Sequence, residues 1–283
     1  MSEQALKQRS VAVVDALSTG RRVDIGVVLH AEWTKLRTVS ATAWLLAGVV
    51  ALTVGVSAAA VGATSCPAGM SCPVDTGQLT LTGVLLGQAV VAILAVQVVS
   101  TEYSTGMILT TLAAMPRRLQ VLGAKSALVA VLVLAASTVA VLGSLLVGGL
   151  VLPGHGFTTA RGYLALSLSD GTVLRAAAGS VLYLGLIALL SVGVAAIVRD
   201  SAVSIGVVLA LLYLPPLFAG FIHNRAWHNR LERWAPTTAG LNIQATTGLR
   251  GLLITPWAGL GVLGIWAAAA LLAGALALRL RDA

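Results

Sequence analysis

Long runs of apolar residues alternate with short polar segments along almost the whole chain. The apolar runs cover residues 41–63, 79–100, 126–152, 176–198, 202–222 and 257–278. An α-helix rises about 1.5 Å per residue, so about 20 residues cross the roughly 30 Å hydrocarbon core of a membrane. The pattern therefore predicts an all-α, polytopic membrane protein with six transmembrane helices.

Composition agrees with this class. Of the 283 residues, 58% are hydrophobic and 10% are charged, whereas soluble domains carry about 25% charged residues. We expect a single transmembrane domain over residues 24–283, preceded by a cytoplasmic tail of residues 1–23. The net charge of +8 is explained by the positive-inside rule, so nucleic acid is not an expected partner.

The distribution of lysine and arginine predicts an orientation. With the N-terminus placed in the cytoplasm, twelve of the 18 basic residues fall inside and six fall outside, which favours cytoplasmic N- and C-termini. Four of the outside residues lie in the last external loop and weaken this bias. The outside residues are Arg161, Arg175, Arg225, Arg230, Arg233 and Arg250.

An amphipathic lead-in helix is predicted to precede the first span. Asp24 is a suitable N-cap, and apolar residues then recur with helical spacing on one face. Trp33, Lys35 and Arg37 suit the cytoplasmic headgroup layer. Glu32 interrupts the apolar face, and it pairs either with Lys35 or with a more distant part of the protein. The apolar face comprises Ile25, Val28, Leu29, Trp33 and Leu36.

The two cysteines of the chain, Cys66 and Cys72, lie in the first external loop, each followed by proline. An oxidising exterior would allow a disulfide that closes this loop. The alternative is two free thiols. A metal site is not expected, because no histidine or carboxylate ligands are nearby.

Gln88 and Gln97 are the amides of the second apolar run. Amide side chains in an apolar helix prefer the interior of the bundle to lipid. They either line a substrate path or form hydrogen bonds between helices.

Other features concern the later segments. Residues 153–175 could form a short interfacial helix, and Pro215-Pro216 should kink or end the fifth span. Trp227, Leu231 and Trp234 have the spacing of an interfacial helix. The nearby His223 and His228 fall on different faces, so we expect solvated histidines rather than a metal site.

The apparent catalytic or cofactor-binding motifs of the chain lie in the wrong structural context. Gly259, Gly261 and Gly264 match a dinucleotide-binding pattern, but they lie inside an apolar span, where close helix packing explains them better. No histidine or acidic pair lies at membrane depth, so we expect no catalytic residues, no metal site and no cofactor in this chain.

The most informative polar segment joins the second and third runs over residues 100–125. An acidic residue ends the second span, a glycine allows a change of direction, and an apolar stripe predicts a short helix along the cytoplasmic surface. A proline then ends that helix, and a lysine marks the return to the membrane. The residues are Glu102, Gly106, Pro116, Arg117, Arg118 and Lys125.

At these positions the chain resembles the permease subunits of type 2 ATP-binding-cassette (ABC) exporters, particularly actinobacterial members. Their pattern is an acidic residue, a glycine, a leucine-rich turn, a proline with arginine nearby, and a lysine at the next span. Met107 departs from it, since threonine is common there. The segment from Ala31 to Thr38 also resembles the pre-span segment of such members.

The resemblance implies a half-transporter in a bacterial plasma membrane. Two permease chains, as a homodimer, would enclose a path. Because the spans offer an apolar path with few polar groups, we expect an apolar or amphiphilic cargo. Two copies of a separate ATP-binding subunit would hydrolyse ATP with Mg²⁺. The lead-in helix and the segment between spans two and three would contact that subunit, which makes the six residues above candidates for ATPase coupling.

The same residues also allow purely structural roles and a function other than transport. Glu102 could merely cap a span, and Arg117 and Arg118 could anchor lipid headgroups. The chain could also be a non-transporting membrane scaffold or a sensor that holds a cytoplasmic partner through the same helices.

Overall fold

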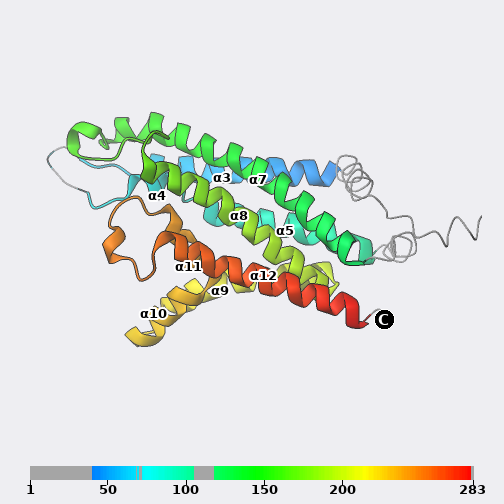
Figure 1. The fold of residues 1–283 in the computed structure, drawn as a ribbon. Coiled ribbons are helices and arrows are strands. Elements are labelled where there is room, and N and C mark those ends of the chain that lie inside the picture. Colours follow the sequence, from blue (N-terminus) through cyan, green and yellow to red (C-terminus); the bar gives the residue numbers. More distant parts are fainter. Residues whose placement is uncertain (1–39, 68, 70–71, 105–117, 282–283) are drawn as a thin grey trace, which may run out of the picture.

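The computed structural model describes residues 40–67, 69, 72–104 and 118–281. Within these ranges the chain consists of helices joined by turns and loops, and no β-strand occurs. The long helices run up and down along one axis and form an elongated bundle (Figure 1). The predicted all-α class is confirmed for this part of the chain.

The long helices are α3 (Ser40–Ala63), α5 (Val84–Ser104), α7 (Arg118–Val151), α8 (Gly171–Val198), α9 (Ser201–Ala219) and α12 (Pro256–Arg281). The short helices are α4 (Thr76–Thr80), α10 (Arg225–Trp234) and α11 (Pro236–Leu241). Single 3₁₀ turns are η1 (Leu152–His155), η2 (Thr159–Arg161), η3 (Asn242–Gln244) and η4 (Leu249–Gly251). Residues 153–175 therefore contain two 3₁₀ turns in place of the expected interfacial helix.

Among the described helices, α3, α7, α8, α9 and α12 are the five that are long and apolar enough to cross a membrane. The chain is therefore a helical membrane protein, and five of the six predicted spans are confirmed in length and composition. The predicted second span, residues 79–100, is not one continuous helix. It is interrupted by a turn at residues 81–83, and the apolar part of α5, Val84–Ser100, is shorter than the five long spans.

Polar side chains from other helices support this interruption. The backbone N–H of Gly83 donates to Ser57 Oγ on α3 at 3.1 Å, and Gln244 Nε2 donates to the Leu81 carbonyl at 3.4 Å. A Cβ at Gly83 would collide with the Thr53 carbonyl, so only glycine lets α3 approach so closely. Backbone groups released inside an apolar bundle need such partners, because no bulk water reaches them.

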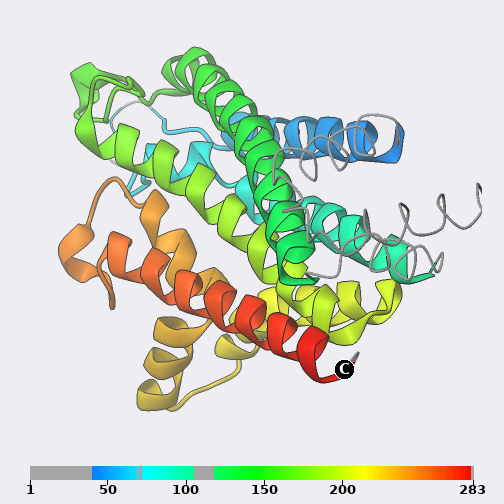
Figure 2. The same ribbon diagram turned by 45° about the vertical axis from the view of Figure 1, so that its right-hand side comes forward.

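The two ends of the bundle hold different segments (Figures 1 and 2). The end here called the disulfide end holds residues 64–67, 72–78, 152–170 and 220–255. The opposite end, here called the α5–α7 end, holds the end of α5, the start of α7, the turn at residues 199–201 and the end of α12. The end of α5 and the start of α7 therefore lie at the same end of the bundle.

The core lies around α8, which packs against α5, α7, α9 and α12. Tyr183, Leu184 and Ile187 of α8 are completely buried. The outer helices instead leave large apolar side chains uncovered, as with Trp44 at 79% exposed and Leu150 at 81%. Such surfaces suit contact with lipid, because lipid tails are as apolar as these side chains.

Glycines set the closest helix contacts. A Cβ at Gly193 of α8 would collide with the backbone of α12 at Ala270 and Leu271, and one at Gly259 would collide with the Ala239 carbonyl. Gly261 and Gly264 have open space beside them. Close packing therefore explains Gly259, but it does not explain the other two glycines of that pattern.

The connection of α8 to α9 is a tight turn. Arg199 has a left-handed backbone with φ of 64°, and Asp200 caps α9 by accepting from the Val203 N–H at 2.8 Å. At the other end of α9, the helix passes through Pro215 and Pro216 and stops at Ala219. The prolines thus lie within one turn of the helix end.

The segment after α10 enters the bundle from the disulfide end without crossing it. Helix α11 packs against α8, α9 and α12 (Figure 2). Thr237 and Ala239 are buried, and Gly240 lies against the Tyr183 ring. Irregular backbone at this depth is tolerated because protein surrounds it.

Candidate functional site

The α5–α7 end is the candidate site for a partner. Glu102 lies in the last turn of α5, and Arg118 is the first residue of α7. The remaining coupling residues before Lys125, which are Gly106, Pro116 and Arg117, lie outside the described residues. So do the lead-in residues Glu32, Trp33, Lys35 and Arg37.

Lys125 is described fully, and it lies inside α7 rather than at its start. The helix begins seven residues before Lys125, so the predicted start of the third span at residue 126 was too late. The Lys125 side chain is buried, and its Nζ donates to the Val98 carbonyl of α5 at 3.4 Å. A buried ammonium requires such acceptors. Lys125 thus joins α7 to α5.

A second contact adds α9 to this pair. Ser201 Oγ donates to Ser100 Oγ on α5 at 2.7 Å, and Ser100 also donates to the Val96 carbonyl at 2.9 Å. Three helices are therefore connected by polar contacts at the α5–α7 end.

The two glutamines of the second apolar run differ in their surroundings. Gln88 is completely buried, and its Oε1 accepts a hydrogen bond from the hydroxyl of Tyr183 on α8. Its Nε2 has no partner among the described residues. Gln97 lies on the exposed side of α5. Gln88 therefore makes a hydrogen bond between helices, one of the two roles predicted for it; the other was to line a substrate path.

At the disulfide end, Cys66 and Cys72 form a disulfide with Cα atoms 6.0 Å apart. Arg161 Nη1 donates to the Cys66 carbonyl at 3.0 Å, and the Cys72 N–H donates to Tyr163 Oη at 2.9 Å. The ring of Tyr163 also packs edge-on against Phe157 at 5.0 Å between centroids. The small loop is thus fixed to the segment that follows α7.

Asp75 links the first and last loops of the disulfide end. Its carboxylate accepts from the Gln78 N–H at 3.1 Å and so caps α4. It also accepts from the N–H of Thr246 at 2.6 Å, from the N–H of Thr247 at 2.8 Å and from the Thr246 hydroxyl. We refer to this arrangement as the Asp75 latch.

The hydrogen bonds of the latch favour the ionised carboxylate. Burial by itself would raise the pKa of Asp75, but the hydrogen bonds from Thr246, Gln78 and Thr247 outweigh it and lower the pKa. Asp170, the N-cap of α8, also has a lowered pKa because the side chain and N–H of Thr172 donate to it. The partners of Asp170 are local, whereas Asp75 reaches another loop.

Sequence patterns did not identify the latch or its neighbour Gln244. An aspartate before Thr76-Gly77 is a recognisable N-cap signal, but the partners that make it a latch, Thr246 and Thr247, are 171 and 172 residues away. Gln244 is buried and donates to Ser180 Oγ at 3.1 Å in addition to the Leu81 carbonyl. Only the folded chain brings these groups together.

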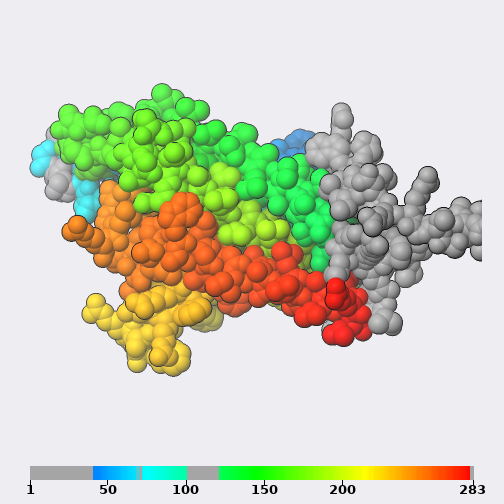
Figure 3. Space-filling model, in the orientation of Figure 1, coloured from blue at the N-terminus to red at the C-terminus, as the bar shows by residue number. Residues whose placement is uncertain are grey.

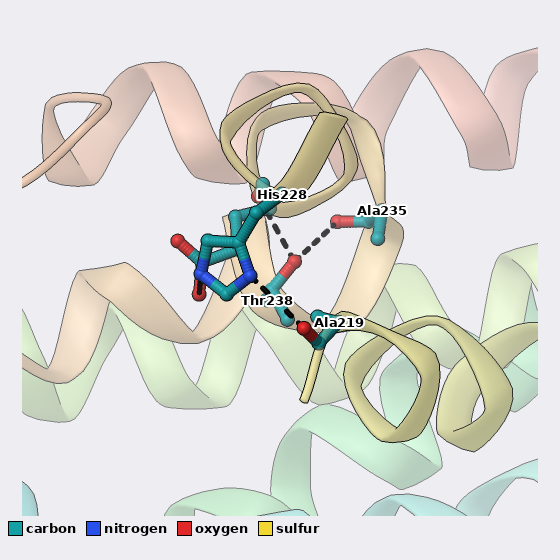
Figure 4. Close-up of polar contacts among 5 residues, drawn as sticks. Ala219, His228, Ala235 and Thr238 are labelled. Atoms are coloured by element: carbon teal, nitrogen blue, oxygen red, sulfur yellow. Dashed lines mark hydrogen bonds and ion pairs between the residues drawn. The ribbon is translucent and has the colours of Figure 1, made fainter. Parts of the chain in front are cut away.

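His228 is not simply solvated. Its Nδ1 lies 3.0 Å from the Ala219 carbonyl at the end of α9, and its Nε2 lies 3.3 Å from Glu232 Oε1 (Figure 4). Thr238 Oγ1 donates to the Glu232 carbonyl at 2.9 Å nearby. The ring thus fixes α10 to α9. His223 is exposed.

The described residues contain no group of three or more histidine, cysteine or acidic side chains suited to a metal ion. No protein-family model, curated protein or solved structure matches this chain. The fold and the sites therefore define the class only, a helical membrane protein.

Proposed function

We propose that this chain is the permease subunit of an ABC exporter in a bacterial plasma membrane. Six spans with both termini in the cytoplasm form one half of the path, and a second copy forms the other half. Two separate ATP-binding subunits, which carry ATP and Mg²⁺, act on the α5–α7 end. The cargo is an apolar or amphiphilic compound.

The observation that carries the proposal is the position of the family-like segment. The residues that resemble exporter permeases span the end of α5, the connection 105–117 and the start of α7. Lys125 and Ser100 tie these helices to each other and to α9. A partner that moves the connection would therefore move three membrane helices together.

One further observation supports a permease that is driven by a partner over a self-powered carrier. Lys125, near the α5–α7 end, is the charged side chain buried among the described residues, while the other buried polar side chains, such as Gln88 and Ser180, are uncharged. Self-powered carriers usually hold an ionisable site near the midplane. Energy for transport would then have to come from a partner.

Co-purification is the first test. The detergent-extracted chain should bring with it a protein that binds and hydrolyses ATP, while the chain alone should show no ATPase activity. A complex that contains no ATP-binding protein would favour the scaffold or sensor alternative.

Charge removal at the α5–α7 end is the second test. Glu102→Ala and Arg118→Ala should each leave assembly intact and lower the ATPase activity of the complex and export about tenfold, the size of a coupling energy of about 1–2 kcal/mol. Arg250→Ala, at the disulfide end, is the control and should change neither rate. If all three variants behave like the unmodified complex, these residues do not couple.

A further inference from the structure

Helix α10 is amphipathic and presents two distinct surfaces. At about 3.6 residues per turn, Trp227, Leu231 and Trp234 share one face, while Arg225 and Arg233 lie on the other side. Trp227 and Trp234 are 62% and 65% exposed. The uncovered face is therefore aromatic, and it is bordered by positive charge.

The arginines of α10 have no carboxylate partner among the described residues. Arg225, Arg230 and Arg233 are all exposed, and Glu232, the acidic residue of the helix, is paired with His228. The guanidinium of Arg230 lies 5.5 Å from the centre of the Trp227 ring. The charge of this surface is thus available to an external anion.

Contacts with the spans fix the position of α10. His228 holds the helix to the end of α9, and Trp266 Nε1 of α12 donates to the Trp234 carbonyl at 2.9 Å. The helix protrudes from the side of the bundle at the disulfide end (Figure 3). It therefore lies where the membrane-spanning helices end, beside the region that lipid headgroups occupy.

We propose that α10 binds the phosphate groups of anionic phospholipids in the leaflet at the disulfide end. Tryptophan prefers the level of the headgroups, with its ring towards the acyl chains. Guanidinium groups match phosphate oxygens with paired hydrogen bonds. Both requirements are met on one helix, with Arg230 at the boundary between the two surfaces.

Charge and apolar surface together select a lipid over a free anion. A soluble phosphate would engage the arginines but leave the tryptophans uncovered, whereas a phospholipid satisfies both. The inference depends on membrane residence and not on the proposed transport function, so either can fail without the other.

The test is a lipid titration of the full-length purified chain in detergent, followed by native mass spectrometry. Phosphatidylglycerol and phosphatidylcholine are added separately at equal concentrations. The unmodified chain should retain phosphatidylglycerol in preference to phosphatidylcholine, and added salt should reduce this preference. Inorganic phosphate at the same concentration should not displace the lipid.

A pair of matched variants locates the site. Arg225→Gln with Arg233→Gln should weaken phosphatidylglycerol retention about 25-fold, because each of the two basic residues near an anionic surface contributes a factor of about five. Arg250→Gln with Arg279→Gln removes the same charge from exposed positions elsewhere and should retain the lipid. Both variants are compared with the unmodified chain in melting temperature.

Three results would overturn the proposal. The first is equal retention of both lipids by the unmodified chain, which requires no variant to fold. The second is equal loss of phosphatidylglycerol in the two double variants. The third is a change of oligomeric state in the α10 variant with unchanged lipid retention, which would mean that a second protein chain covers this surface.

Discussion

Single polar residues hold together segments that are far apart in this chain, and Asp75 is the clearest case. One carboxylate satisfies three backbone N–H groups and one hydroxyl. Hydrogen bonds to a charged acceptor contribute more than neutral ones. The latch therefore joins the α4 end of the interrupted second helix to the loop that leads into α12.

Loss of this carboxylate should destabilise the protein. We expect Asp75→Ala to lower the free energy of unfolding by about 2 kcal/mol and the melting temperature by a few degrees. Asp75→Asn should cost nearly as much, because its amide nitrogen cannot accept a hydrogen bond. Asp170→Ala, which removes a local cap only, should lower the melting temperature by less than Asp75→Ala does. Thermal unfolding in detergent measures all three, and an Asp75→Asn protein as stable as the unmodified one would contradict the latch.

Acid should open the latch. The pKa of Asp75 is below the ordinary value of 3.8 in the folded protein, so its contribution to stability is present at neutral pH. That contribution is lost as the pH falls below the ordinary value and through the lowered pKa. The stability difference between the unmodified chain and Asp75→Ala should therefore shrink below about pH 4. A constant difference across this range would exclude the carboxylate as the cause.

At the scale of elements, small residues determine how closely the helices approach. Gly193 lets the backbones of α8 and α12 touch, and Gly274 of α12 lies against Ala196 and Gly193 on α8. Close approach of this kind stabilises helix pairs in membranes through van der Waals contact. The α8–α12 pair is thus sensitive to single methyl groups.

An added methyl group at this contact should separate the two helices. We expect Gly193→Ala to destabilise the protein by about 1–3 kcal/mol, because the neighbouring atoms belong to the backbone and cannot rotate away. Gly264→Ala lies in open space on α12 and should be neutral or stabilising by up to about 1 kcal/mol. Unfolding in detergent compares the two, and equal effects would show that packing does not distinguish them.

The disulfide closes a loop at one end of the bundle and does not join two of its long helices. Replacement of both Cys66 and Cys72 by serine should cost about 2 kcal/mol, the value for closure of a short loop. A reducing agent should lower the melting temperature of the unmodified chain and leave the double variant unchanged. A melting temperature that does not respond to reduction would show that the bond contributes nothing to stability.

At the scale of the whole molecule, the helices of the bundle agree with the predicted spans wherever the length and hydropathy of an apolar run determine the helix. Five predicted spans occur within a few residues of their expected limits, although α7 and α8 begin earlier than expected. The interruption at residues 81–83 was not predicted, because Leu81, Thr82 and Gly83 lie inside a long run without charged residues. The break depends on Ser57 and Gln244, which belong to other helices.

The candidate sites also combine features that the sequence identified with contacts that only the structure showed. The segment around Glu102 and Lys125 was identified from the sequence, because its residues are neighbours in the chain. The contact of Lys125 with Val98 and the linkage of Ser201 to Ser100 came from the structure alone. Contacts between distant segments leave no local signal in a single sequence.

The sequence by itself therefore determined the class of helical membrane protein. Charge is costly to place in hydrocarbon, and the long apolar runs accordingly contain almost no charged residues. It also indicated the polar connection between the second and third apolar runs as the candidate site for a partner. Only the tertiary structure decided which polar groups meet. The Asp75 latch, the Gln88–Tyr183 pair and the position of α10 all result from packing, which brings together residues whose separation in the chain carries no information about their contact.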